Sequence, residues 1–164
     1  MDERTLKEIV TTARKEALAR GHVIRLTTTG RSMLPFLKDN DSVEVVYAKE
    51  RDLAIGDLIL FTPKHANAFV AHRLVYRKIG PHPDRLVTKG DASFRCDIPI
   101  TYEQVIGRIV RIRKPSCSIG LEGPGARLFS YVLLFFSMTR TIFAVLWLLR
   151  KLRCVMTGSR SRTC

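Results

Sequence analysis

The segment Ile55–Asp91, IGDLILFTPKHANAFVAHRLVYRKIGPHPDRLVTKGD, contains the strongest indications of the fold. Three runs rich in Val, Ile, Leu, Phe and Tyr, at residues 57–62, 68–79 and 85–89, are separated by segments with proline, glycine and asparagine. Short apolar and β-branched runs between turn-forming residues are typical of β-strands. The segment therefore predicts three consecutive strands joined by two turns.

The same pattern continues on both sides of this segment. Further short runs predict strands at residues 23–29, 42–48 and 104–113. In residues 1–22 apolar side chains recur at three- and four-residue spacing, which predicts an amphipathic helix. Frequent short strands with no helical pattern between them favour a mostly β fold, an antiparallel, partly closed barrel-like sheet. We expect this β domain to cover residues 23–114.

The C-terminal third has a different composition. Prolines and glycines in residues 115–127 predict a linker, residues 128–149 are the most apolar stretch of the chain, and residues 150–164 form a basic tail. As a helix, the apolar stretch would be about 33 Å long, enough for a hydrocarbon core of about 30 Å. Arg140 lies near its middle. We expect a membrane-associated helix there, either a single C-terminal span or a monotopic anchor at the cell membrane.

The net charge of +13 is concentrated in the same third. Residues 1–103 carry 17 basic and 14 acidic side chains, whereas residues 104–164 carry 11 basic side chains and one acidic one. Basic charge around an apolar stretch is typical of membrane-associated segments, while nucleic-acid surfaces usually interleave basic and aromatic residues on one folded face. We therefore expect a lipid bilayer as a partner and no nucleic acid. Five basic residues flank the stretch on each side, so the charge does not predict its orientation.

The cysteines predict neither a zinc site nor a disulfide framework. The chain has Cys96, Cys117, Cys154 and Cys164, no two of which form a CxxC pair. No histidine lies at a metal-ligand spacing from any of them. We expect no metal and no cofactor.

Three short motifs in the predicted β domain carry residues suited to nucleophilic and acid–base chemistry. Ser32 lies in GRSMLP, directly after a predicted strand, where a turn can expose its hydroxyl beside backbone N–H groups. His72 lies within a predicted strand, and an imidazole can act as a general base near neutral pH. Asp91 ends the sequence TKGD and Asp97 follows six residues later; a carboxylate is the usual partner of a catalytic imidazole. Taken singly, each motif is better explained by a structural role.

Together and in this order, the motifs resemble the boxes of the signal peptidase I family. GRSMLP is similar to its nucleophile box, GDLILF at 56–61 to the strand that follows, His72-Arg73 to the box with the general base, and TKGD with Asp97 to a later box. The resemblance covers about residues 25–113. The histidine at the base position is similar to the branch found in archaea, the endoplasmic reticulum and some sporulating bacteria, because the common bacterial branch uses a lysine there.

This resemblance implies a serine endopeptidase. Ser32 would be the nucleophile, His72 the general base, and the backbone N–H of Ser32 would hold the oxyanion. An aspartate would orient His72; we favour Asp97 and keep Asp91 open, because Asp91 directly follows Gly90 and could instead hold the loop. The implied substrates are leader or signal peptides of membrane-targeted or exported proteins, with small residues before the scissile bond.

Two alternatives and one departure accompany this interpretation. A self-cleaving repressor-type peptidase resembles the chain in its Ser-Met box, but it uses a lysine base and an upstream helix-turn-helix, for which residues 1–22 are too few. A non-catalytic membrane-bound β module would not need the serine, histidine and aspartate boxes. The family usually places a membrane span before the nucleophile, and residues 1–31 contain no such apolar run.

Overall fold

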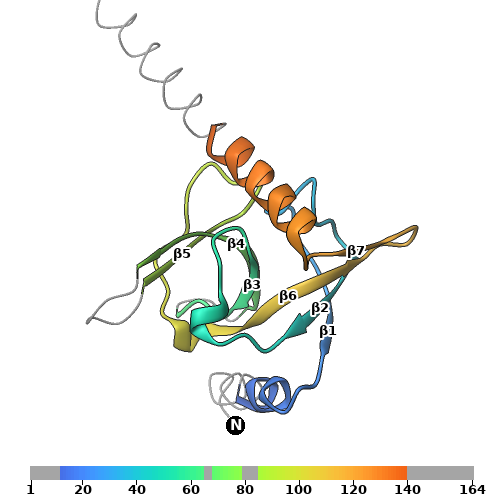
Figure 1. Ribbon diagram of the computed structural model, residues 1–164, viewed down its shortest axis with the longest axis vertical. Coiled ribbons are helices and arrows are strands. Elements are labelled where there is room, and N and C mark those ends of the chain that lie inside the picture. The colour runs from blue at the N-terminus through green and yellow to red at the C-terminus, as the bar shows by residue number, and fades with distance from the viewer. Residues whose placement is uncertain (1–11, 65–67, 79–84, 140–164) are drawn as a thin grey trace, which may run out of the picture.

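A seven-stranded sheet forms the centre of the computed structural model, which describes residues 12–64, 68–78 and 85–139 (Figure 1). Helices cover residues 12–19 and 124–139, at the two ends of the described chain. The strands are β1 (Ile24–Thr27), β2 (Ser42–Val46), β3 (Leu58–Phe61), β4 (Val70–Lys78), β5 (Arg85–Lys89), β6 (Val105–Arg113) and β7 (Ser118–Gly120). Two short 3-10 turns, Glu50–Asp52 and Tyr102–Gln104, precede β3 and β6.

The strands follow the order β1-β2-β6-β3-β4-β5, and β7 pairs with β6. Every pairing is antiparallel, so the prediction of a mostly β, antiparallel fold is confirmed. The expected partial closure into a barrel is wrong, because the sheet is open: within the described residues no ladder joins its first strand, β1, to its last, β5.

The six strands predicted from the sequence are present, with ends that differ by a few residues. β7 is an addition, because Ser118–Gly120 lies inside the expected linker 115–127. A run of three residues is too short for its periodicity to predict a strand. β7 is defined by its pairing with β6, in which Ile119 lies opposite Ile112. The helix at 124–139 also begins inside that expected linker.

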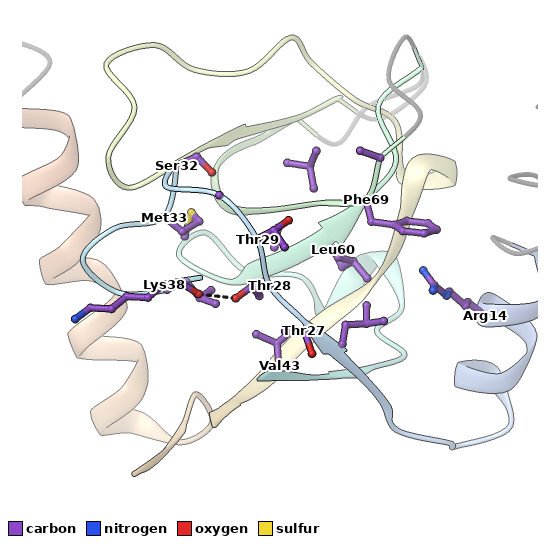
Figure 2. A pocket seen from close by; sticks show the side chains of 16 residues that line it. Arg14, Thr27, Thr28, Thr29, Ser32, Met33, Lys38, Val43, Leu60 and Phe69 are labelled. Carbon is purple, nitrogen blue, oxygen red and sulfur yellow. Dashed lines mark hydrogen bonds between the residues drawn. The ribbon is translucent and has the colours of Figure 1, made fainter. Parts of the chain in front are cut away.

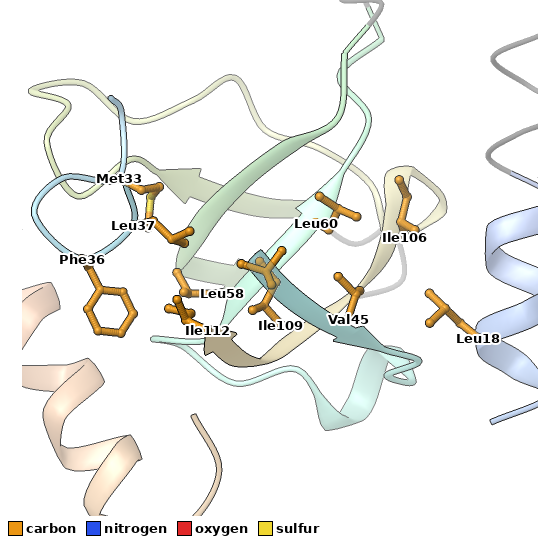
Figure 3. Packing of buried hydrophobic residues seen from close by; sticks show 11 residues of the cluster. Leu18, Met33, Phe36, Leu37, Val45, Leu58, Leu60, Ile106, Ile109 and Ile112 are labelled. Atoms are coloured by element: carbon orange, nitrogen blue, oxygen red, sulfur yellow. The ribbon is translucent and has the colours of Figure 1, made fainter. Parts of the chain in front are cut away.

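Alternation along β3 separates the core into two clusters. Leu58 and Leu60 belong to a cluster with Leu18 of the N-terminal helix, side chains of the turn after β1, and residues of β2 and β6 (Figure 3). Ile59 and Phe61 belong to a second cluster with residues of β4, β5 and the segments beside them. Successive side chains of a strand point to opposite faces, so a strand buried on both faces contributes to both clusters.

The C-terminal helix differs from the sequence expectation. No helix in the described part of the chain is long and apolar enough to cross a membrane. The expected span over 128–149 is therefore not supported; its described portion packs on the sheet through Ser130, Leu133 and Ser137. Residues 140–149 and the basic tail 150–164 lie outside the described residues, as do residues 1–11 of the expected N-terminal helix.

Candidate active site

The structure brings Ser32, His72 and Asp97 into one hydrogen-bonded chain. His72 lies in the buried first half of β4, and its Nε2 is 2.9 Å from Ser32 Oγ. On the other side of the ring, Nδ1 is 2.6 Å from Asp97 Oδ2. Hydroxyl, imidazole and carboxylate are therefore connected in the order that allows the ring to accept a proton from the serine while the carboxylate stabilises the resulting cation.

Ser32 lies in the segment that connects β1 to β2. Asp41 holds the two ends of this segment together through hydrogen bonds. The backbone N–H of Thr28 donates to the Asp41 carbonyl at 2.8 Å, and the carboxylate accepts from the Lys38 N–H and from Lys114 Nζ, both at 2.9 Å. Burial opposes the charged carboxylate, but these hydrogen bonds outweigh it and hold the pKa of Asp41 below its ordinary value. Met33, the residue after the nucleophile, is buried in the core and anchors the turn from inside.

Thr88 completes the environment of Asp97. Its hydroxyl donates to Asp97 Oδ2 at 2.6 Å, and its carbonyl accepts the Asp97 backbone N–H at 2.8 Å. Thr88 is fully buried in β5, so it fixes the position of the carboxylate that faces His72. Sequence reasoning gave Thr88 no role of its own; its signal was the position two residues before Gly90 in the TKGD motif.

Asp91 pairs with Arg73 and lies away from the imidazole. Arg73 Nε and Nη2 donate to the two carboxylate oxygens at 2.9 and 2.7 Å, a bidentate ion pair in which the Arg73 side chain is 1% exposed. Of the two aspartates left open by the sequence, Asp97 is the one that contacts His72. Through this ion pair with Arg73, the Asp91 carboxylate fixes the start of the loop that follows β5.

The remaining guanidinium nitrogen of Arg73, Nη1, binds the turn before β3. Arg73 Nη1 donates to the Gly56 carbonyl at 2.8 Å, and Gly56 adopts a positive φ of 96° that favours glycine. Asp57 accepts the Ala54 N–H at 2.8 Å, and burial raises the pKa of the Asp57 carboxyl. This turn therefore serves the structure around β4 and contributes no group to the hydrogen-bonded chain.

Gly90 brings the loop after β5 against the nucleophile. A Cβ atom added at Gly90 would lie 2.6 Å from the Ser32 carbonyl oxygen and 3.1 Å from Ser32 Cβ. Beside it, the Ala92 N–H donates to the same carbonyl at 2.8 Å. The Ser32 backbone N–H makes no hydrogen bond to the described part of the chain, and it is therefore available to an oxyanion.

A cavity of about 460 Å³ leads away from Ser32. Figure 2 shows Ser32 at one end and Arg14 of the N-terminal helix at the other. Residues 27–30 and 68–71 line the cavity, and Leu26, Val43 and Leu60 give it an apolar lining. The space beside the serine therefore has a mixed lining, in which threonine hydroxyls lie among the apolar side chains.

The described residues hold no group of three or more histidine, cysteine, aspartate or glutamate side chains arranged for a metal ion. Cys96 and Cys117 are exposed free thiols.

Comparison of the chain with protein-family models, curated proteins and solved structures finds no match.

Proposed function

We propose that the chain is a serine endopeptidase in which Ser32 is the nucleophile, His72 the general base and Asp97 the carboxylate that orients it. The observation that carries this proposal is the pair of contacts on either side of the His72 ring, 2.9 Å to Ser32 Oγ and 2.6 Å to Asp97 Oδ2. His72 Nε2 takes the hydroxyl proton as Ser32 Oγ attacks the scissile carbonyl carbon, and Asp97 stabilises the imidazolium that forms.

The second half of the reaction uses the same groups in reverse. The imidazolium of His72 gives its proton to the leaving amine, which departs and leaves an ester on Ser32. His72 then takes a proton from water as the water oxygen attacks the ester. When the bond to Ser32 breaks, the imidazolium returns this proton to Ser32 Oγ, and the new carboxyl end is released. In both steps the Ser32 N–H donates to the oxygen that becomes negatively charged.

Two open strand edges beside the cavity favour an extended peptide as the substrate. Among the described residues, β1 pairs on one side only, with β2. The first part of β4 pairs with β3, and its ladder to β5 begins at Arg73. Residues next to both edges line the cavity. A peptide can add as a strand to such edges through backbone hydrogen bonds while its side chains enter apolar space. This agrees with the leader or signal peptides that the resemblance to signal peptidase I implies.

The outward face of the C-terminal helix supports attachment to a membrane surface. Its large apolar side chains are exposed, whereas its inward face carries Ser130, Leu133 and Ser137. The exposed residues are Leu128, Phe129, Tyr131, Val132, Phe135 and Phe136. Basic residues dominate this third of the chain, and they complement an anionic lipid surface. We therefore place the lipid on this helix face, as a monotopic anchor.

Peptide cleavage tests the peptidase. The purified full chain is incubated with synthetic leader peptides that end in Ala-X-Ala before the expected cleavage site, and the products are identified by mass spectrometry. We expect cleavage by the wild type and by Ser118→Ala, whose hydroxyl lies on exposed β7, and none by Ser32→Ala. Cleavage that persists in Ser32→Ala contradicts the proposal. Cleavage of the chain itself, with the peptides left intact, favours the self-cleaving alternative.

Flotation with vesicles tests the anchor. The full chain is mixed with phosphatidylcholine vesicles with and without phosphatidylglycerol, and bound protein is recovered from the top of a density gradient. We expect binding that increases with the anionic lipid and decreases in Phe135→Ser. Equal flotation of the wild type and this variant contradicts the assignment of lipid to this face.

A further inference from the structure

The two strands that carry the candidate active site present a second set of side chains to their other face. Cross-strand register places Arg73 of β4 opposite Lys89 of β5. Each of these cations directly follows a residue that contacts Asp97: Arg73 follows His72, and Lys89 follows Thr88. Because side chains alternate along a strand, the two cations point away from the site, toward the C-terminal helix.

Both cations bind serines of this helix. Arg73 Nη1 donates to Ser130 Oγ at 3.3 Å, while Lys89 Nζ donates to the carbonyl and to the hydroxyl of Ser137. Ser130 and Ser137 are seven residues apart, so they lie on one face, two turns apart along the helix. Figure 1 shows the helix, in orange, beside the loop that follows β5.

We propose that the helix at 124–139 is a positioning element of the active site, and that it acts through the buried contact between Lys89 and Ser137. This inference rests on the proposed peptidase function. Lys89 is 1% exposed and Ser137 is 6% exposed, so the ammonium group is held out of water. A buried charge is costly unless polar groups surround it, and it therefore favours the one placement of the helix that supplies Ser137.

From Ser137 the contacts continue into the loop that carries Asp97. The Ser137 hydroxyl donates to the Asp91 carbonyl at 3.4 Å. The next residue, Ala92, donates its N–H to the Ser32 carbonyl at 2.8 Å. The same loop ends at Asp97, 2.6 Å from His72. A displacement of Ser137 is thus transmitted to the nucleophile through Ala92 and to the imidazole through Asp97.

A helix that merely covered the sheet would not need this polar contact. Apolar residues of similar volume cover a face at least as favourably as a buried charge does, and Leu133 of the same helix already packs on the core. Buried polar contacts instead select one register among several that apolar packing would allow. The Lys89–Ser137 contact therefore fixes the register of the helix against the loop 90–97.

Removal of one hydroxyl tests the inference. Ser137→Ala is compared with Thr139→Ala, which also removes one hydroxyl from the helix. Within the described residues, the Thr139 hydroxyl donates only to the helix carbonyl of Phe136. We expect Ser137→Ala to lower kcat for a leader peptide about 10- to 100-fold with little change in KM, because small misplacements of reacting groups are costly. Thr139→Ala should match the wild type, and Ser137→Thr, which keeps the hydroxyl, should recover most of the rate.

A second measurement separates positioning from general destabilisation. We expect the proton between His72 Nδ1 and Asp97 to give a downfield NMR resonance. Ser137→Ala should shift or broaden this resonance while the thermal unfolding curve still shows a folded protein. If Ser137→Ala equals Thr139→Ala in kcat and in this resonance, or loses activity only in proportion to its unfolded fraction, the positioning role is wrong. If the wild type itself cleaves no peptide, the proposed function fails instead.

Discussion

His72 and Arg73 are consecutive residues of β4, yet they bind different aspartates. His72 Nδ1 lies 2.6 Å from Asp97, whereas the Arg73 guanidinium forms a bidentate pair with Asp91. One strand therefore separates two tasks, with the candidate catalytic groups on one face and a buried ion pair on the other. Substitutions at the two aspartates should have different consequences.

Asp97→Asn should impair catalysis and leave the fold intact. The amide keeps the shape of the side chain but not its charge, so it stabilises the imidazolium poorly and no longer selects the ring tautomer. We expect kcat to fall about 10²- to 10⁴-fold with a nearly unchanged thermal midpoint. Steady-state kinetics and thermal unfolding measure the two effects, and a variant with nearly wild-type kcat would exclude Asp97 from this role.

Asp91→Ala should instead destabilise the protein. It leaves the guanidinium of Arg73 buried without its carboxylate, and breaking a buried pair in this way costs about 3–5 kcal/mol. Urea unfolding measures the loss in the free energy of unfolding. The double variant Arg73→Met, Asp91→Leu should be less destabilised than the sum of the two single changes, and simple additivity would contradict a coupled pair.

Gly90→Ala should displace the nucleophile. The new methyl group would meet the Ser32 carbonyl oxygen at 2.6 Å, and backbone on both sides must move to admit it. We expect a loss of about 1–3 kcal/mol in stability and slower acylation of Ser32 by a fluorophosphonate probe. Gly120→Ala is the matched control, since nothing lies within 4 Å of a Cβ atom there. Equal acylation rates in the two variants would show that the close approach is unimportant.

Asp41 should make the stability depend on acid pH. Its pKa is below the ordinary value of about 3.9, so its charged form stabilises the folded state at pH values above about 4. As the pH falls through the lowered pKa, the carboxylate is protonated and this contribution is lost. Asp41→Asn should therefore be less stable than the wild type near pH 7, by about 1.5–3 kcal/mol for a buried charged hydrogen bond, with a smaller difference near pH 3. Urea unfolding at both pH values measures it, and a constant difference would contradict the assignment.

The strand pattern was predictable because it is local. Turn residues such as Gly56 and Pro63 interrupt apolar runs, and the sheet follows these interruptions. The open form of the sheet, in which β1 and β5 are the two unjoined edge strands, was not predictable. Closure into a barrel depends on the curvature and register of the whole sheet.

The partition of the two aspartates was predictable in part. Because side chains alternate along a strand, Arg73 and His72 point to different faces of the sheet. Arg73 therefore needs a hydrogen-bond acceptor of its own on the face away from His72. Both aspartates lie in a loop, however, where no such periodicity applies, and only the folded chain pairs each with its partner.

For the C-terminal helix, the apolar composition of the segment suggested a membrane span and drew attention away from the spacing of its polar residues. Its many apolar residues indicate lipid, but Ser130 and Ser137, on one face, indicate a polar contact with protein. The spacing of the two serines was the available signal. Their partners, Arg73 and Lys89, lie far away in the sequence and could not be assigned from it.

Ser130 and Ser137 follow every strand of the sheet in the chain. During synthesis they consequently leave the ribosome after β1 to β7, and the sheet can form before the helix is available to it. If this helix positions the proposed active site, the residues of that site are made before the helix that aligns them. Alignment of the proposed site would then come after the formation of the sheet rather than together with it.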